Sequence, residues 1–188
     1  LSGLNPPSHS PTYGSKFYQK RDIKKMIDIV RKRTGKDIIS WRSHGLIYDD
    51  KTYSILNEQG IKLISDELNS TKFFPEKIKE GLISHPINVI YDHDHIYHAH
   101  RDKEFCRKAR ERGYGADCFG CDSYTIGEWG KLVERQIIDI EKKGGIATVL
   151  MHPVCQYLSD EFRTAEKLFR VFSKYKIIWA KEIPDYIK

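Results

Sequence analysis

Helix-like and strand-like stretches alternate along most of this 188-residue sequence, and the alternation restricts the fold more than any other feature. Short apolar runs rich in β-branched residues are separated by stretches whose apolar residues follow helical spacing. Strands joined through a helix pair in parallel, because the chain crosses back over the sheet before the next strand begins. The sequence therefore predicts one α/β domain over residues 1–188, with a parallel sheet that is open or closed into a barrel.

Both kinds of element can be placed from local signals. The expected helices cover residues 15–36 with a stop at Gly35, 49–59 with a stop at Gly60, 102–112, 125–143 behind a capping box from Thr125 to Glu128, and 162–172. The expected strands cover residues 38–41, 61–65, 87–91, 146–151 and 177–180. Residues 146–151 are apolar throughout, which predicts a strand buried on both faces. No hairpin signal is obvious, which also favours a parallel sheet.

The basic charge of the chain is concentrated in its first predicted helix. There are 32 Lys and Arg against 26 Asp and Glu, a net charge of +6, and residues 15–36 alone hold nine basic and two acidic residues, or +7. We interpret this stretch as the solvated face of an amphipathic helix rather than as a nucleic-acid surface, since no nucleic-acid motif accompanies it. No stretch is long and apolar enough to span a membrane.

Cysteine usage and the start of the sequence bear on the compartment. The four cysteines, at positions 106, 118, 121 and 155, are too few and too scattered for a disulfide framework. The sequence also opens without a basic and apolar leader. Together these features favour a reducing, cytoplasmic compartment.

Two reactive side chains are expected at the carboxyl ends of strands, where the active sites of parallel α/β folds lie. Arg42 follows the strand that ends at Trp41, and His152 follows the strand that ends at Met151. An imidazole in such a place is a candidate general acid or base, although a hydrogen-bonded structural histidine has the same signature.

Two other groups of residues have the composition of metal sites. In the opening loop, His9 and Asn5 have the spacing of a ligand pair, but Asn is a poor ligand for a transition metal. Residues 93–100 hold four histidines, and the pair Cys118-x-x-Cys121 follows. A zinc ribbon needs a second such cysteine pair, which the sequence lacks, so a polar surface loop is the preferred interpretation.

Four segments, by their order and spacing, resemble motifs of the polysaccharide deacetylases, the NodB-homology family of metal-dependent carbohydrate esterases and amidohydrolases. Ser8-His9-Ser10 before a long helix resembles a His-Ser/Thr-x-x-His metal-ligand motif. A second resemblance lies in Thr34-Gly35-Lys36 followed by Trp41-Arg42-Ser43-His44-Gly45. It is to the family motif in which an Arg ends a strand and forms one wall of the substrate groove. Residues 52–66 resemble the helix and strand that follow, and Thr148 to Pro153 resembles the strand that delivers a leucine and the catalytic histidine.

The resemblance implies a distorted or incomplete (β/α) barrel that removes an N-acetyl or similar acyl group from a sugar amine or related amide. The cofactor implied is a divalent metal, with zinc expected, and the substrate is a carbohydrate or a small acylated molecule. The residues that it assigns are His152 and Arg42 as catalytic, Trp41, His44 and Tyr13 as substrate-binding, and His9 and Asn5 as metal ligands.

The chain departs from the family pattern in its metal-binding motifs. The family's Thr-Phe-Asp-Asp-Gly motif, which supplies the catalytic base and a metal-binding Asp, is absent, and Asp49-Asp50 is instead typical of a helix cap. We therefore expect the sequence to begin after the first strand or two. If His9 is the second ligand of the next motif, Asn5 takes the first place, and if His9 is the first, Tyr13 takes the second.

These departures leave two expectations open. The family's fourth motif is not assigned, and Asp66 is a possible partner for His152 or Arg42. The alternative to an active hydrolase is a catalytically inactive relative that binds a glycan or another ligand.

Overall fold

The computed structural model describes residues 14–46, 48–111 and 119–187, which form a mixed α/β structure. Its helices are α1 (Lys16–Thr34), α2 (Asp50–Glu58), α3 (Lys103–Glu111), α4 (Ile126–Lys142), α5 (Pro153–Asp160) and α6 (Arg163–Phe172). Three short helical turns are η1 (His44–Leu46), η2 (His93–Tyr97) and η3 (Ala180–Tyr186). The strands are β1 (Ser40–Trp41), β2 (Leu63–Ile64), β3 (Glu76–Lys77) and β4 (Ile83–Ser84).

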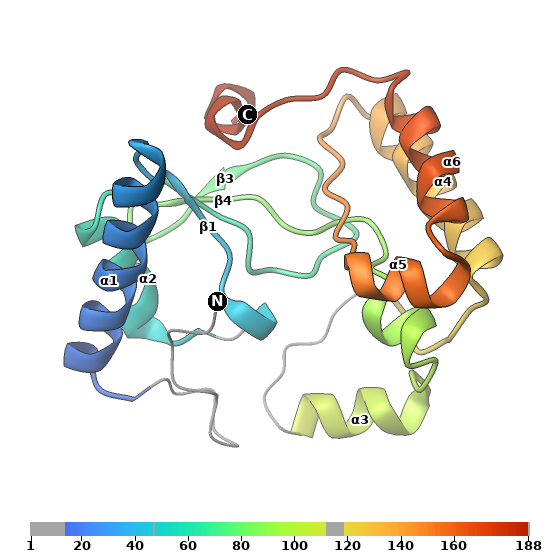
Figure 1. The fold of residues 1–188 in the computed structure, drawn as a ribbon, viewed down its shortest axis with the longest axis horizontal. Helices are drawn as coiled ribbons and strands as arrows, with labels where there is room; N and C mark the ends of the chain where they lie inside the picture. The colour runs from blue at the N-terminus through green and yellow to red at the C-terminus, as the bar shows by residue number, and fades with distance from the viewer. Residues whose placement is uncertain (1–13, 47, 112–118, 188) are drawn as a thin grey trace.

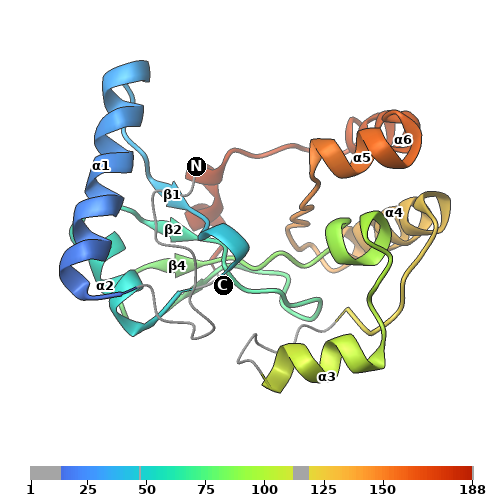
Figure 2. The same cartoon turned by 60° about the horizontal axis from the view of Figure 1, so that its bottom comes forward.

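The helices gather at two ends of the molecule, with the strands nearer the first (Figures 1 and 2). Helices α1 and α2 pack together at one end, and α4, α5 and α6 pack together at the other. Five of these helices were predicted, and their end signals are confirmed. Gly35 ends α1 in the left-handed conformation (φ 69°), and Asp49 and Thr125 each form a capping box.

The sheet is open and mixed, with the strand order β1-β2-β4-β3. Strands β1, β2 and β4 are parallel to one another, but β3 runs antiparallel to β4. Strands β1 and β2 lie within predicted strands, whereas β4 was not predicted. The strand predicted over residues 87–91 was wrong, because the structure shows there a single bridge, between Ile87 and Leu68. The turn between β3 and β4 closes through a bond from the Ile78 amide to the Leu82 carbonyl (2.9 Å), and Gly81 has a φ of 78°. The prediction of a purely parallel sheet was therefore wrong at this edge, and the described residues do not form a closed barrel.

Residues 146–151 are extended, but they do not form the doubly buried strand that was predicted, and each is only half-buried. A side chain replaces part of the expected ladder, alongside backbone bonds from the Ile146 amide to the Phe73 carbonyl (2.8 Å) and from the Val89 amide to the Thr148 carbonyl (3.4 Å). The buried Asn88 amide donates to the carbonyls of Ile146 (2.8 Å) and Lys72 (2.9 Å) and accepts from the Thr148 amide (2.8 Å). Backbone groups satisfied by a side chain need no neighbouring strand.

The strand predicted over residues 177–180 was wrong. Residues 177–179 have no sheet partner, Ala180 is the first residue of η3, and Ile177 and Trp179 are 78% and 75% exposed. The chain then enters η3, which lies beside β2. An apolar run alone cannot distinguish a strand from an exposed segment, because pairing depends on residues elsewhere in the chain.

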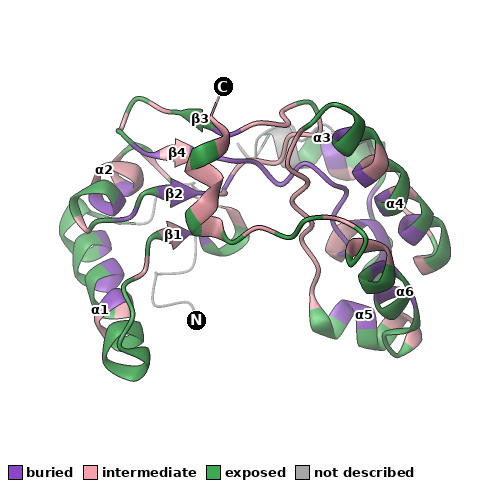
Figure 3. Ribbon diagram, turned by 90° about the horizontal axis from the view of Figure 1, so that it is seen from above, coloured by how far each residue is buried: buried purple, intermediate pink, exposed green. Residues whose placement is uncertain are grey.

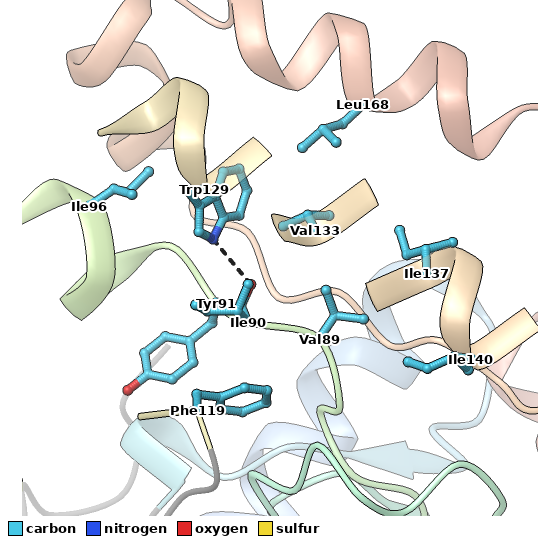
Figure 4. Close-up of a cluster of buried hydrophobic side chains, with 10 residues drawn as sticks. All are labelled: Val89, Ile90, Tyr91, Ile96, Phe119, Trp129, Val133, Ile137, Ile140 and Leu168. Carbon is cyan, nitrogen blue, oxygen red and sulfur yellow. Dashed lines mark hydrogen bonds between the residues drawn. The ribbon is translucent and has the colours of Figure 1, made fainter. Parts of the chain in front are cut away.

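Two apolar clusters stabilise the two ends, and each helix buries the side that faces its cluster (Figure 3). The first comprises Ile23, Ile27, Trp41, Ile55, Leu56, Ile61, Ile64 and Leu82. The second comprises Val89, Ile90, Tyr91, Ile96, Phe119, Trp129, Val133, Ile137, Ile140 and Leu168 (Figure 4). In the second cluster the fully buried Trp129 indole donates to the Ile90 carbonyl (3.1 Å), so its one polar atom is satisfied.

We predict that stability falls as the pH is lowered, because of His85. This side chain is 1% exposed, and burial lowers its pKa to about 4. Between pH 6.5 and about 4 the unfolded chain binds a proton that the folded chain excludes, so folding loses up to about 3 kcal/mol across this interval. Urea unfolding of the wild type and of His85→Gln, at about pH 7 and about pH 5, measures this loss. The variant should lose less stability between the two conditions, and an equal loss would contradict the assignment.

Candidate active site

His152 and Asp92 form the centre of the candidate site. His152 is the N-cap residue of α5, and Pro153 takes the first helical position, where its missing amide costs nothing. Asp92 follows residues 87–91 and directly precedes η2. Contact between α5 and η2 brings the two residues together across 60 positions of the sequence.

The Asp92 carboxylate is completely buried and accepts three hydrogen bonds. Its Oδ1 lies 2.6 Å from Nδ1 of His152, and its Oδ2 accepts from the His152 amide (2.7 Å) and from Nε2 of Gln156 (2.9 Å). Because an ionised carboxylate only accepts, the Nδ1 atom of His152 carries the proton between them. The ring is thereby fixed, and its Nε2 has no hydrogen-bond partner among the described residues.

This pairing changes the acidity of His152. The hydrogen bond to Asp92 raises the pKa of His152, while partial burial and the positive charge of Arg42 act in the opposite direction. The side chain is 38% exposed, so the ring can exchange protons with solvent or a substrate. A fixed, partly exposed imidazole of raised pKa is suited to donate a proton near neutral pH.

A second histidine–carboxylate pair lies beside the first. Nδ1 of His93 lies 2.9 Å from Oδ1 of Asp94, and the His93 ring centroid is 5.3 Å from that of His152. Asp94 also accepts from the Tyr91 hydroxyl (2.9 Å), which in turn accepts from the buried Arg101 (2.9 Å). These bonds lower the pKa of Asp94, with His93 contributing most among the groups that favour its ionised form. Two imidazoles, each bonded to a carboxylate through Nδ1, therefore lie side by side with their ring planes tilted by 56°.

Arg42 follows β1, as predicted, and its charge acts on the His152 site. Its guanidinium donates to the Ser65 carbonyl (3.1 Å) and hydroxyl (2.9 Å), which fixes its position while the side chain stays exposed. Burial raises the pKa of Asp66, and the positive charge of Arg42 opposes that shift. Asp66 accepts from the Ser43 amide (2.6 Å) and hydroxyl (3.0 Å). Asp92, and not Asp66, is the carboxylate bonded to His152.

Asp92 was not predicted as a site residue, although the sequence contains a signal for it. It stands directly after the predicted strand 87–91, the position at which Arg42 and His152 were recognised. The neighbouring histidines were interpreted as a polar surface loop instead. In the structure, His95 is completely buried with its Nδ1 2.9 Å from the Asp122 carbonyl, which is a structural role. His98 and His100 are exposed, and Cys118 lies outside the described residues.

The remaining predicted residues are divided between the core and the undescribed part of the chain. Trp41 is 8% exposed and belongs to the first apolar cluster, and His44 is exposed in η1. Their roles in substrate binding stay predictions. Tyr13, His9 and Asn5 lie outside the described residues, as does any metal site that they form.

A different group could hold a metal ion. Donor atoms of Asp92, His152 and Cys155 lie within 4.8 Å of one another, and nitrogen, oxygen and sulfur are all zinc ligands. The present arrangement suits a proton better, because two ligands of tetrahedral zinc lie about 3.3 Å apart, whereas Nδ1 of His152 and Oδ1 of Asp92 are separated by 2.6 Å. Burial and the Asp92 charge also raise the pKa of the Cys155 thiol to about 11.

We predict that zinc binding to this group strengthens as the pH rises. Both Cys155 and His152 have raised pKa values, so each holds a proton that the metal must displace. Calorimetric titration with zinc at several pH values measures the effect, and Cys155→Ser should weaken binding by at least about tenfold. Cys121→Ser is the matched control. Affinity that is independent of pH, or equal loss in both variants, would exclude this group as the zinc site.

Comparison with protein-family models, with curated proteins and with solved structures found no match for this chain. Three findings therefore rest on the structure alone: the α/β class, the paired histidines and the group that could hold a metal. No helix in the described ranges is long and apolar enough to cross a membrane, and Cys121 and Cys155 are free thiols.

Proposed function

We propose that this chain is a hydrolase that removes an N-acetyl or similar acyl group from a sugar amine or a related amide. The observation that carries the proposal is the bond between His152 and the buried Asp92, which fixes the imidazole at the N-terminus of α5 and raises its pKa. Cleavage of an amide needs a proton donor, because an amine leaves only when its nitrogen is protonated. The resemblance to polysaccharide deacetylases supplies the substrate class.

His152 acts as the general acid in this proposal. The proton on Nδ1 stays on the ring, in the hydrogen bond to Asp92. The proton on Nε2 passes to the nitrogen of the scissile bond as that bond breaks. Asp92 acts through His152: it orients the ring and stabilises the positive charge that the ring carries before the transfer. Gln156, which donates to Asp92, positions the carboxylate in turn.

His93 is the candidate base. The Asp pair that serves this purpose in the deacetylases is absent from the sequence, and the His93–Asp94 pair stands beside His152. The unprotonated Nε2 of His93 accepts a proton from water, and the hydroxide oxygen bonds to the carbonyl carbon. The C–N bond then breaks, which releases a carboxylic acid and the amine. Arg42 supplies a positive charge for the oxygen that becomes negative during the attack.

A divalent metal would polarise the carbonyl and acidify a bound water. Zinc is the ion expected from the resemblance, and Asp92, His152 and Cys155 are the described residues that could hold it. If His152 held the metal, it would lose the proton that it needs to act as the general acid. The steps above therefore involve only the side chains.

The alternative is an inactive relative that binds a glycan or another acylated ligand. The absence of the Asp pair from the sequence favours it. An acetate-release assay distinguishes the two functions, since only the hydrolase turns the ligand over.

We predict that His152→Ala lowers turnover of acetylated chito-oligosaccharides by about 10²- to 10⁴-fold without unfolding the protein. Asp92→Asn should also lower turnover, and it should move the high-pH limb of the activity profile to lower pH. The reason is that Asp92 is the main cause of the raised pKa of His152, which must be protonated to act. Asp49→Asn, which keeps the helix cap at a remote site, is the matched control. Activity of His152→Ala near the wild-type level would exclude the mechanism.

We further predict that His93→Ala lowers turnover by about 10²-fold or more while the substrate KM changes little, because the base acts on water and not on the bound sugar. The kcat and KM of the variant, measured with the same substrate, check this. A rise in KM with unchanged kcat would assign His93 to substrate binding instead.

A further inference from the structure

Helix α1 carries a stripe of basic and apolar side chains that no other described element covers. Its opposite side is buried through Gln19, Asp22, Ile23 and Ile27, and it packs against α2. The outward stripe consists of Tyr18, Arg21, Lys25, Ile29 and Lys32, at spacings of three, four, four and three residues. Side chains at these spacings lie in one straight row along a helix.

Large apolar side chains on this helix are exposed. Tyr18 and Ile29 are 47% and 48% exposed within the stripe, and Phe17, next to its start, is 71% exposed. A helix that is only a solvated outer face has polar residues at such positions. Lysines interleaved with an aromatic and an aliphatic side chain on one face are instead typical of helices that lie in a membrane interface.

Two of the three cations of the stripe have no partner among the described residues. Arg21 pairs with Asp22 of its own helix (2.8 Å), and outside the stripe Lys16 and Lys20 pair with Glu58 and Arg31 pairs with Asp37. Lys25 and Lys32, by contrast, form no ion pair with any described residue. They line a shallow hollow of about 350 Å³ together with Arg21, Ile29 and the ion pair of Lys24 with Asp28. Their ammonium groups are therefore available to an anionic surface.

We propose that the outward stripe of α1 docks on the surface of an anionic phospholipid membrane. Charge complementarity selects the headgroups, because the stripe presents the unpaired Lys25 and Lys32 in a row with Arg21, which pairs with Asp22. The apolar side chains Tyr18 and Ile29 select a bilayer over a nucleic acid, because they can enter the boundary between headgroups and acyl chains. Since α1 lies at the opposite end of the molecule from α5, docking leaves the His152 site uncovered (Figures 1 and 2). This inference is independent of the proposed hydrolysis.

Sedimentation with vesicles tests the proposal. The full chain is mixed with vesicles of phosphatidylcholine, with or without phosphatidylserine, at low and at physiological salt. We expect binding only to the anionic vesicles, with Lys25→Gln/Lys32→Gln weakening it about 30-fold and Ile29→Ser about tenfold. The matched control Lys131→Gln/Lys167→Gln removes the same charge from α4 and α6 and should bind like the wild type. Circular dichroism verifies that each variant is folded.

Several results would overturn the proposal. Absence of binding to anionic vesicles would do so, as would equal binding to neutral ones. Equal losses in the stripe and control variants would show that net charge alone is responsible. Titration with a labelled RNA provides the last comparison: tighter binding to RNA than to vesicles, unaffected by Ile29→Ser, would assign the stripe to nucleic acid.

Discussion

The buried carboxylate of Asp92 is the group on which the second half of the structure depends. An ionised carboxylate removed from water is costly unless hydrogen bonds compensate it, and Asp92 accepts three. Its donors come from the first residue before α5 and from within α5, whereas Asp92 itself precedes η2. The same bonds that place α5 therefore fix the His152 ring, so the fold and the candidate chemistry rest on one interaction.

The parts of the fold that local chemistry determines were predictable from the sequence. The caps at Asp49 and Thr125 and the stop at Gly35 place three helices with little reference to the rest of the chain. Strands were less predictable, since a strand exists only where another segment pairs with it. Residues 146–151 and 177–180 have similar apolar character, yet the first is held by the Asn88 side chain and the second is exposed.

The candidate site was predictable to the same limited extent. Arg42 and His152 were recognised because reactive groups gather at the ends of strands in α/β folds. The carboxylate partner of His152 was not recognised, because Asp92 and Asp66 are both acidic residues that follow strand-like segments. Only the packing of α5 against η2 decides between them. The His93–Asp94 pair was hidden within the histidine-rich stretch for the same reason.

The Asn88 side chain also determines how the two apolar clusters are joined. Its amide forms hydrogen bonds to both sides of the junction between the clusters, to Lys72 near the sheet and to Ile146 and Thr148, which follow α4 in the chain. The Asn88 bonds act together with two backbone bonds, from the Ile146 amide to the Phe73 carbonyl (2.8 Å) and from the Val89 amide to the Thr148 carbonyl (3.4 Å). One short side chain thus helps to fasten segments that lie as many as 60 positions apart along the chain.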